Sequence, residues 1–307
     1  MKKLLIIINP AAGTRQGAKY LADISDVFCR AGYETVIATT AARGDGTEIA
    51  RTRGPEADIV VAIGGDGTFN EVVAGLLQAE AQVPVGYIPA GTTNDFATSL
   101  GLSKDLVQAA VDVVQGKDYA IDIGSFNGRY FSYVASFGAF SNTSYEVPQN
   151  LKNVFGHMAY ILGGAKDLLS LRPVKVRLEN EVGIYGGNYI FGAVCNSTSM
   201  GGVLTLDHDM VDMSDGKFEV LLIRMPRNLI ELQQIVVALT TQRYRECPMM
   251  SFFSSSKLLV EADPGMNWTL DGEFQEGAGR IEIFNHRQAV TIRVPENALV
   301  ALEERSE

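Results

Sequence analysis

A glycine-rich segment, Gly64-Gly65-Asp66-Gly67-Thr68-Phe69-Asn70-Glu71, follows an apolar run typical of a buried strand and precedes a segment with helical periodicity. Glycine lets a backbone approach a ligand closely, and the first turn of a helix presents unpaired N–H groups to an anion. The segment therefore predicts a phosphate-binding loop. It is not the common dinucleotide-binding pattern, because the third glycine of Gly-x-Gly-x-x-Gly would fall at Asn70.

Asp66 stands where the phosphates of a ligand would lie. A carboxylate beside a polyphosphate is repulsive unless a cation lies between them, so Asp66 indicates a divalent ion, for which Mg²⁺ is the usual choice. The alternative is structural, since aspartate is also a good N-cap and Asp66 could simply cap the following helix.

A second polar loop, Gly91-Thr92-Thr93-Asn94-Asp95-Phe96-Ala97, follows another predicted strand, and Asn9-Pro10 with Gly13 and Thr40 follow two more. In an open parallel sheet, ligands gather at the carboxyl ends of the strands. We therefore expect these segments to line one edge, although each taken singly is more often just a turn.

The elements that must position these loops follow βαβα order over the first 120 residues, which predicts a parallel sheet with helices. Its expected strands are Lys3–Asn9, Tyr33–Thr40, Asp58–Gly64 and Val83–Pro89. Helices are expected between them and over Thr68–Gln78 and Lys104–Gln115.

Beyond about Asp118 the pattern changes to short strands separated by Gly, Asn and Asp clusters, which predicts a β-rich, β-sandwich-like second domain. Two helices, Leu151–Leu169 and about Asn228–Leu239, interrupt the strands, and a last helix is expected over Pro295–Glu304. One continuous strand is expected over Arg129–Phe137, and two separate strands are expected over Arg280–Phe284 and Ala289–Val294. The expected division is 1–120, 121–286 and a segment 287–307 that packs back on the first domain.

Composition narrows the classes of function. The 307 residues carry 36 acidic and 26 basic side chains, a net charge of −10, which disfavours nucleic acid as a partner. Three scattered cysteines, Cys29, Cys195 and Cys247, form neither a disulfide framework nor a Cys-x-x-Cys site. The uncharged stretch Val182–Leu206 is interrupted by glycines, so no membrane span is expected, and we expect a cytoplasmic protein.

With both glycine loops, Asn9-Pro10 and Asp271-Gly272-Glu273, the sequence resembles the diacylglycerol kinase catalytic family, which includes sphingosine and ceramide kinases. The resemblance covers nearly the whole chain and is closest to the soluble bacterial members. It implies ATP as phosphoryl donor, Mg²⁺ as cofactor and a lipid hydroxyl as acceptor. The expected lipid is diacylglycerol, which would be converted to phosphatidic acid. The protein would reach this lipid by associating peripherally with the membrane surface.

The resemblance also implies roles for individual residues. The nucleotide would lie in a cleft between the two domains, touched by residues matching Asn9, Thr40, Gly64, Gly65, Asp66, Gly67, Thr68, Asn70 and Thr92, with Asn94 and Asp95 supporting the cleft. Asp66 would organise the catalytic Mg²⁺. Glu273 matches the catalytic carboxylate, which would accept the proton of the lipid hydroxyl; without the motif it would be an ordinary turn carboxylate.

A structural Mg²⁺ site in bacterial members matches Asp215, with backbone carbonyls at Asp212 and Lys217. The family usually has two adjacent acidic residues before the glycine, and here the first is Ser214. An alternative interpretation of Asp215-Gly216 is a type I′ hairpin turn.

Two other functions stay open at this point. An NAD kinase shares the first loop but is disfavoured by the second loop and by Asp271-Gly272-Glu273. A non-catalytic regulator that binds lipid or nucleotide is disfavoured by the presence of Asp66 and Glu273. The sequence leaves the acceptor lipid open and is compatible with a homodimer. Arg224, Arg227, Arg243 and Arg245 could meet an anionic membrane or be scattered solvated charges.

Overall fold

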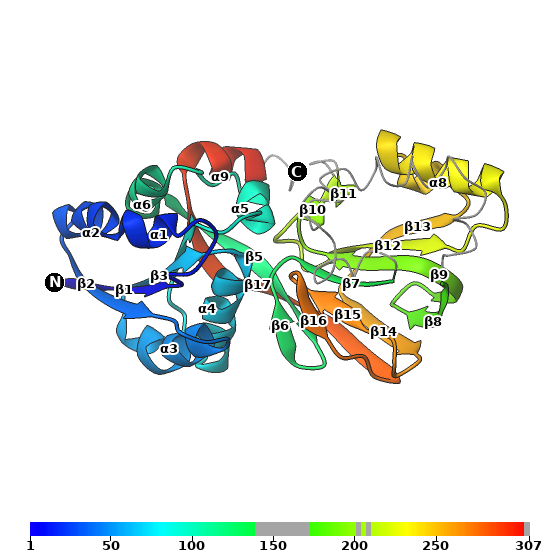
Figure 1. Cartoon of the computed structure of the whole chain (residues 1–307), viewed down its shortest axis with the longest axis horizontal. Helices are drawn as coiled ribbons and strands as arrows, with labels where there is room; N and C mark the ends of the chain where they lie inside the picture. Colours follow the sequence, from blue (N-terminus) through cyan, green and yellow to red (C-terminus); the bar gives the residue numbers. More distant parts are fainter. Residues whose placement is uncertain (139–171, 201–203, 207–209, 304–307) are drawn as a thin grey trace. The chain divides into compact units, whose positions relative to one another are not determined.

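The computed structural model describes residues 1–138, 172–200, 204–206 and 210–303, and it divides into two units (Figure 1). Unit 1 comprises Met1–Ile123 and Arg287–Glu307, and unit 2 comprises Gly124–His286. The helix expected over Leu151–Leu169 lies outside the described residues. Strands β5 (Lys117–Phe126) and β17 (Arg280–Val294) each contribute residues to both units.

Five strands of unit 1 pair in parallel, in the order β17-β4-β3-β1-β2, and β5 pairs with β17. Its other strands are β1 (Lys2–Ile8), β2 (Tyr33–Thr39), β3 (Ile59–Gly64) and β4 (Val85–Pro89). Every residue of β3 and β4 is buried. Burial on both faces explains why these strands are nearly continuous runs of apolar residues rather than alternating ones.

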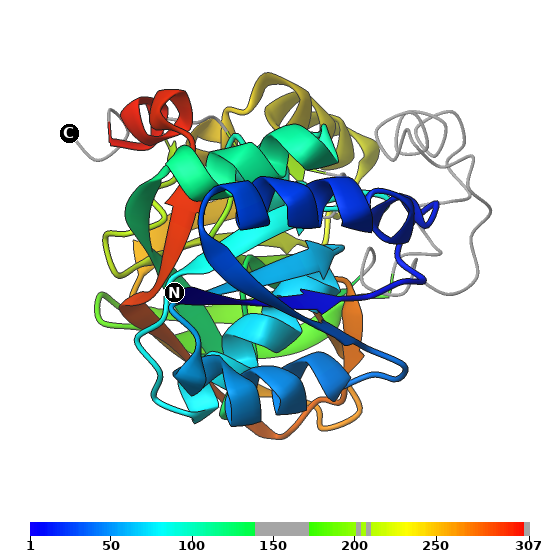
Figure 2. The same cartoon turned by 90° about the vertical axis from the view of Figure 1, so that its left-hand side faces the viewer.

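Helices cover both faces of this sheet (Figure 2). Helices α2 (Leu21–Arg30) and α6 (Leu106–Gln115) pack together on one face, and α3 (Asp45–Arg53) and α4 (Asp66–Gln78) pack together on the other. The remaining helices of the unit are the short α1 (Gln16–Lys19) and α5 (Asp95–Ser99), the 3₁₀ turn η1 (Gly54–Glu56) and α9 (Glu296–Glu303). The parallel pairing brings the carboxyl ends of β1 to β4 to one edge.

Unit 2 is built from antiparallel strand pairs. Besides β5 and β17, its described residues form β6 (Arg129–Phe131), β7 (Val134–Gly138), β8 (Val174–Glu179), β9 (Ile184–Cys195), β10 (Ser199–Met200), β11 (Leu204–Thr205), β12 (Phe218–Arg224), α8 (Leu229–Thr241), η5 (Tyr244–Glu246), β13 (Met250–Ser255), β14 (Lys257–Ala262), β15 (Trp268–Leu270) and β16 (Glu273–Gln275). Trp268 is buried between Phe126 and Phe137, with ring centroids 5.1 and 4.8 Å away. These aromatic rings anchor the core of the unit.

The predicted fold class is confirmed, since an α/β unit with parallel strands precedes a unit whose strands are largely antiparallel. Two strand predictions were wrong in detail. The strand predicted over Arg129–Phe137 is split into β6 and β7, because the carboxylate of Asp271 accepts the N–H groups of residues 132–134. Conversely, β17 runs unbroken through 285–288, where Gln288 takes a φ of +50° and Asp122 accepts its N–H.

Among the described residues, no helix has the length and apolar character needed to span a bilayer.

The packing of α3 against α4 gives a test of this architecture. A Cβ on Gly75 would lie 2.2 Å from the carbonyl oxygen of Thr47 and 2.8 Å from Cβ of Ala50. Gly75→Ala should therefore lower the free energy of unfolding by about 2 kcal/mol, because the helices must separate. Urea denaturation measures this, with Gly183→Ala as control, since a Cβ there meets nothing within 4 Å. Equal stability of both variants would contradict the packing.

Candidate active site

The loops that follow β1, β3 and β4 touch one another through their backbones. A Cβ on Gly91 would lie 2.5 Å from Cα of Gly65, and one on Gly13, whose φ is +51°, would lie 2.6 Å from the carbonyl oxygen of Ala90. The N–H of Ala90 donates to the carbonyl oxygen of Gly64 at 2.7 Å. Larger residues would force the loops apart, so glycine at these positions is what allows the two polar loops to share one site.

The carboxylate of Asp66 joins the first loop to the second. Asp66 opens α4, but the N-cap of that helix is Gly65 and no side chain caps it. The carboxylate instead accepts the N–H of Asp95 at 2.9 Å and that of Phe96 at 3.2 Å, at the start of α5. The hydroxyl of Tyr87 donates a third hydrogen bond at 3.2 Å. The N-cap interpretation was therefore wrong for α4.

The surroundings of Asp66 disfavour its negative charge. Burial is the largest cause and the nearby carboxylate of Asp95 the second, and together they raise the pKa of Asp66 to about 6. The three hydrogen bonds oppose this rise but do not cancel it. A carboxylate held in such a place gains by binding a cation, so the residue fits a Mg²⁺ ion on its partly exposed side.

Asn94 shapes the second loop. Its φ of +53° is left-handed, a conformation that asparagine tolerates better than most residues. Its side-chain oxygen accepts the N–H of Gly91, and its side-chain amide donates to the carbonyl oxygen of the same residue, both at 3.0 Å. The two bonds close a tight turn that leaves Thr92 exposed at its tip.

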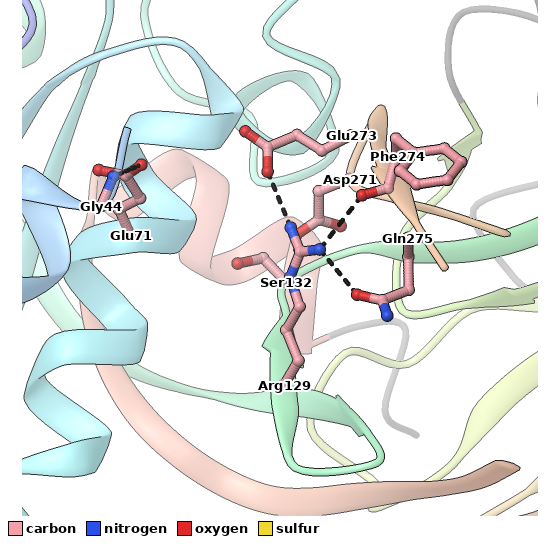
Figure 3. Close-up of polar contacts among 8 residues, drawn as sticks. All are labelled: Gly44, Glu71, Arg129, Ser132, Asp271, Glu273, Phe274 and Gln275. Atoms are coloured by element: carbon pink, nitrogen blue, oxygen red, sulfur yellow. Dashed lines mark hydrogen bonds and ion pairs between the residues drawn. The ribbon is translucent and has the colours of Figure 1, made fainter. Parts of the chain in front are cut away.

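Asn9 and Thr40 lie at the ends of the two neighbouring strands. The side chain of Asn9 accepts the N–H of Ala11 at 3.0 Å, which fixes the turn after β1, and the N–H of Thr40 donates to Ile8. Glu71, which directly follows Asn70 in α4, accepts the N–H group of Gly44 at 2.7 Å (Figure 3) and that of Gly46 at 3.0 Å. Glu71 thus anchors the start of α3 to the first glycine loop.

A pocket of about 420 Å³ adjoins the second loop within unit 1. Thr92 and Asn94 line it together with Thr14, Gln16 and Lys104, whereas Asp66, Asn9 and Thr40 do not. The predicted residues of unit 1 follow strands that end at one edge of the sheet, but only those of the second loop line this pocket.

In unit 2, Glu273 is positioned by a tight hairpin between β15 and β16. Asp271 and Gly272 have φ angles of +50° and +81°, as a two-residue type I′ turn requires. The buried carboxylate of Asp271 accepts the N–H groups of Ser132 at 2.6 Å and of Tyr133 and Val134 at 3.0 Å. Asp271 therefore fixes the backbone from which Glu273 projects.

Arg129 holds the side chain of Glu273 (Figure 3). Its guanidinium donates to Oε2 of Glu273 at 2.8 Å, to the side chain of Gln275 at 2.7 Å and to the carbonyl oxygen of Phe274 at 3.3 Å. About a third of each charged side chain is exposed, so this ion pair orients the carboxylate more than it stabilises the fold. Sequence reasoning did not select Arg129; its one local signal is the Asn127-Gly128 turn before it, which pairs β5 with β6.

A second acidic group lies before and within β12. Asp212 accepts the N–H and the hydroxyl of Ser214, both at 2.9 Å, and Asp215 accepts the N–H of Lys217 at 2.8 Å. Only Gly216 of the Asp215-Gly216 pair has a positive φ, so the type I′ interpretation was wrong. Ser214 thus serves as a hydrogen-bond donor at the position where the family usually has an acid.

Glu219 belongs to the same group, although the sequence analysis did not select it. It is 4% exposed, and burial followed by the charge of Asp215 raises its pKa to about 9. Its Oε2 is buried without a hydrogen-bond partner in the described part of the chain. The sequence signal was an acid at a strand position facing the core. An unpartnered carboxyl oxygen beside two aspartates fits a hard cation, although no group of three metal-binding side chains is formed among the described residues.

The pairing registers relate Glu273 to this acidic group. Glu273 of β16 pairs with Leu270 of β15, which in turn pairs with Ala135 of β7. The same row runs on through Val194 of β9 to Val220 of β12, the residue next to Glu219. Both features therefore lie at the same end of the unit 2 strands, four strand spacings or about 19 Å apart. A cation at Asp215 would act on the loop structure and not on the carboxylate of Glu273.

Known proteins resemble this chain in sequence. The diacylglycerol kinase catalytic domain matches residues 3–126. The diacylglycerol kinase of Bacillus subtilis (strain 168) is 36% identical over 276 residues, which cover 89% of this chain and 90% of that protein.

Solved structures share the fold. The crystal structure of a diacylglycerol kinase from Bacillus anthracis str. Sterne matches with a TM-score of 0.73 and 18% identity over 97% of this chain and 98% of that one. An NAD kinase from Archaeoglobus fulgidus in complex with ATP matches with a TM-score of 0.54 and 12% identity, over 99% and 98% of the two chains. From the sequence relatives and the matched catalytic domain, the chain belongs to the diacylglycerol kinase family and is a lipid kinase.

Proposed function

We propose that the protein transfers the γ-phosphoryl group of ATP to the free hydroxyl of a diacylglycerol, giving phosphatidic acid, in a reaction that depends on Mg²⁺. The observation that carries this proposal is the carboxylate of Asp66, held by the N–H groups of the second glycine loop at the edge of a parallel sheet. Phosphoryl transfer requires mainly positioning and neutralisation of charge, which such a site can supply.

The residues of unit 1 would bind the donor. Backbone N–H groups of Gly64 to Asn70 would contact the phosphates, and Asn9, Thr40 and Thr92 the rest of the nucleotide. A Mg²⁺ ion held by Asp66 would neutralise the charge on the phosphates when bound. Both oxygens of Asp66 already accept N–H groups, so their remaining lone pairs would reach the ion, directly or through water.

The residues of unit 2 would act on the acceptor. The carboxylate of Glu273 would accept the proton of the lipid hydroxyl while the hydroxyl oxygen attacks the γ-phosphorus of ATP. The bond between the γ-phosphorus and the bridging oxygen would break, and ADP would leave. This role requires Glu273 within hydrogen-bond reach of that hydroxyl. Arg129 would be a positioning residue, because its guanidinium holds the carboxylate of Glu273 through a hydrogen-bonded ion pair.

A second cation would stabilise the turn before β12. Asp215 and the backbone carbonyls of Asp212 and Lys217 would hold it, and the unpartnered oxygen of Glu219 supports a positive charge nearby.

An acceptor panel tests the proposal. The purified chain is supplied with ATP and MgCl₂, and phosphorylated product is measured with dioleoylglycerol in mixed micelles, with sphingosine and with NAD. Phosphatidic acid as the dominant product supports the proposal, and phosphorylated NAD as the dominant product would replace it. Failure to turn over any acceptor would favour a binding protein on this fold.

Asp66→Asn tests the role of the carboxylate. Asparagine keeps the size and one acceptor oxygen for the N–H groups of α5 but loses the charge that attracts Mg²⁺. We expect kcat to fall by at least about 100-fold, because charge neutralisation in the transition state is lost. Steady-state kinetics measure this, with Asp26→Asn as the control on an exposed helix face. An Asp66→Asn enzyme with normal kcat would contradict the assignment.

The raised pKa of Asp66 predicts how stability depends on pH in the absence of metal. Between about pH 4 and 6 the folded protein holds a proton at Asp66 that the unfolded chain releases, so stability contributed by this group rises as pH falls. The full difference is about 3 kcal/mol for a pKa of about 6 against 3.8. Urea unfolding in EDTA from pH 4 to 7.5 measures it as wild type minus Asp66→Asn. A difference that is constant with pH would show that the pKa is ordinary.

Glu273→Gln tests the base. The amide retains a hydrogen-bond partner for Arg129 but accepts no proton, so kcat should fall by about 100-fold or more while the KM for ATP is unchanged. Glu276→Gln, three residues further on and exposed, is the matched control. A loss confined to KM would assign Glu273 to binding instead of proton transfer.

A further inference from the structure

Tyr87 places a hydroxyl in a strand that is otherwise apolar and completely buried. It is the middle residue of β4, and its side chain is 1% exposed. A Cβ on the preceding residue, Gly86, would meet Val113 of α6, so Tyr87 points to the opposite face of the sheet, toward α4. There its ring packs on Phe69 of α4, with the ring centroids 4.8 Å apart.

Three buried aromatic rings join the elements around Asp66. The ring of Phe69 packs on that of Tyr87 and also on that of Phe96 in α5, with centroids 5.2 Å apart in the second pair. Phe69 lies one turn after Asp66 in α4, and the N–H of Phe96 donates to the carboxylate of Asp66 at 3.2 Å. Close packing of these rings fixes the direction from which the hydroxyl of Tyr87 approaches that carboxylate.

The two oxygens of Asp66 have different surroundings. Oδ1 accepts the hydroxyl of Tyr87 and the N–H of Phe96, both at 3.2 Å. Oδ2 accepts only the N–H of Asp95, at 2.9 Å, within the part of the chain that the structure describes. Each carboxylate oxygen has two lone pairs, so both lone pairs of Oδ1 are used and one lone pair of Oδ2 remains. The remaining lone pair is the one available to a cation.

The number of available oxygens matters to the choice of ion. Mg²⁺ demands nearly ideal octahedral geometry and keeps several of its waters, so a single carboxylate oxygen suits it. Ca²⁺ is larger, takes more oxygen ligands in flexible geometry and often binds both oxygens of one carboxylate. A carboxylate with one oxygen already saturated by hydrogen bonds therefore disfavours Ca²⁺ more than it disfavours Mg²⁺.

We propose that Tyr87 is a positioning residue that determines which metal ion the site selects. By occupying Oδ1 of Asp66, its hydroxyl leaves Oδ2 as the ligand atom and so favours Mg²⁺ over Ca²⁺. Tyr87 acts through Asp66 and is not itself a ligand. The inference rests on the proposed function in one respect, since it takes Asp66 as the residue that holds the cation.

Metal binding without turnover tests the proposal on the full chain. Tyr87→Phe removes the hydroxyl and keeps the ring that packs on Phe69. Bound Mn²⁺ is measured by electron paramagnetic resonance in the presence of ADP, and Mg²⁺ and Ca²⁺ are titrated as competitors. We expect the affinity for Ca²⁺ relative to Mg²⁺ to rise at least about fivefold in Tyr87→Phe, because both oxygens of Asp66 become available.

Two controls accompany this measurement. Asp66→Asn identifies the Mn²⁺ that belongs to Asp66, because the second cation proposed at Asp215 should still bind. Tyr189→Phe removes the hydroxyl of a buried tyrosine in the core of unit 2 and should leave the relative affinity as in the wild type. An unchanged relative affinity in Tyr87→Phe would overturn the proposal, and so would an equal change in Tyr189→Phe.

Turnover provides a second measurement and separates this inference from the proposed function. With ATP, Mg²⁺ and dioleoylglycerol in mixed micelles, Ca²⁺ should inhibit Tyr87→Phe at a concentration at least about fivefold lower than the wild type. A shifted metal preference in a protein without kinase activity would support the role of Tyr87 and refute the proposed function. Equal Mn²⁺ binding by the wild type and Asp66→Asn would refute the metal role of Asp66 and this inference with it.

Discussion

The candidate site depends on the hydrogen bonds that the carboxylate of Asp66 accepts from the N–H groups at the start of α5. This carboxylate ties the loop after β3 to the loop after β4 and places a buried negative charge near a second one, that of Asp95. A fold selected only for stability would gain by replacing such a charge, since burial raises the pKa of Asp66 to about 6. A buried carboxylate with a raised pKa is typical of functional sites, and the proposed cation site would give Asp66 such a function.

The two units position their carboxylates by different means. Unit 1 has glycine where its loops meet, so that the backbones around Gly13, Gly65 and Gly91 come within van der Waals distance. Unit 2 uses a type I′ turn whose first residue, Asp271, buries its carboxylate on three consecutive N–H groups. The first solution leaves room for a ligand at the backbone, and the second fixes the direction of one side chain.

Charge is distributed unevenly over the chain. The total of −10 disfavours nucleic acid as a partner, yet residues 224–246, around α8, contain four arginines and two glutamates. Net charge alone therefore gives a misleading account of which surfaces this protein offers, because screening limits each charge to its neighbourhood of about 10 Å at moderate ionic strength. The distribution of charged residues along a helix whose buried face is known says more about a surface than the net charge does.

The sequence by itself determined the parallel sheet of unit 1 and the loops at its edge, because buried strands and glycine turns are written as local patterns. It also indicated the motif that carries Glu273. It did not determine that Arg129 would hold Glu273, that Glu219 would join Asp215, or that Asp271 would interrupt the strand predicted over Arg129–Phe137. Each of these depends on residues far apart in the chain, and only tertiary packing decides which distant donor reaches a given carboxylate and which face of α8 stays exposed.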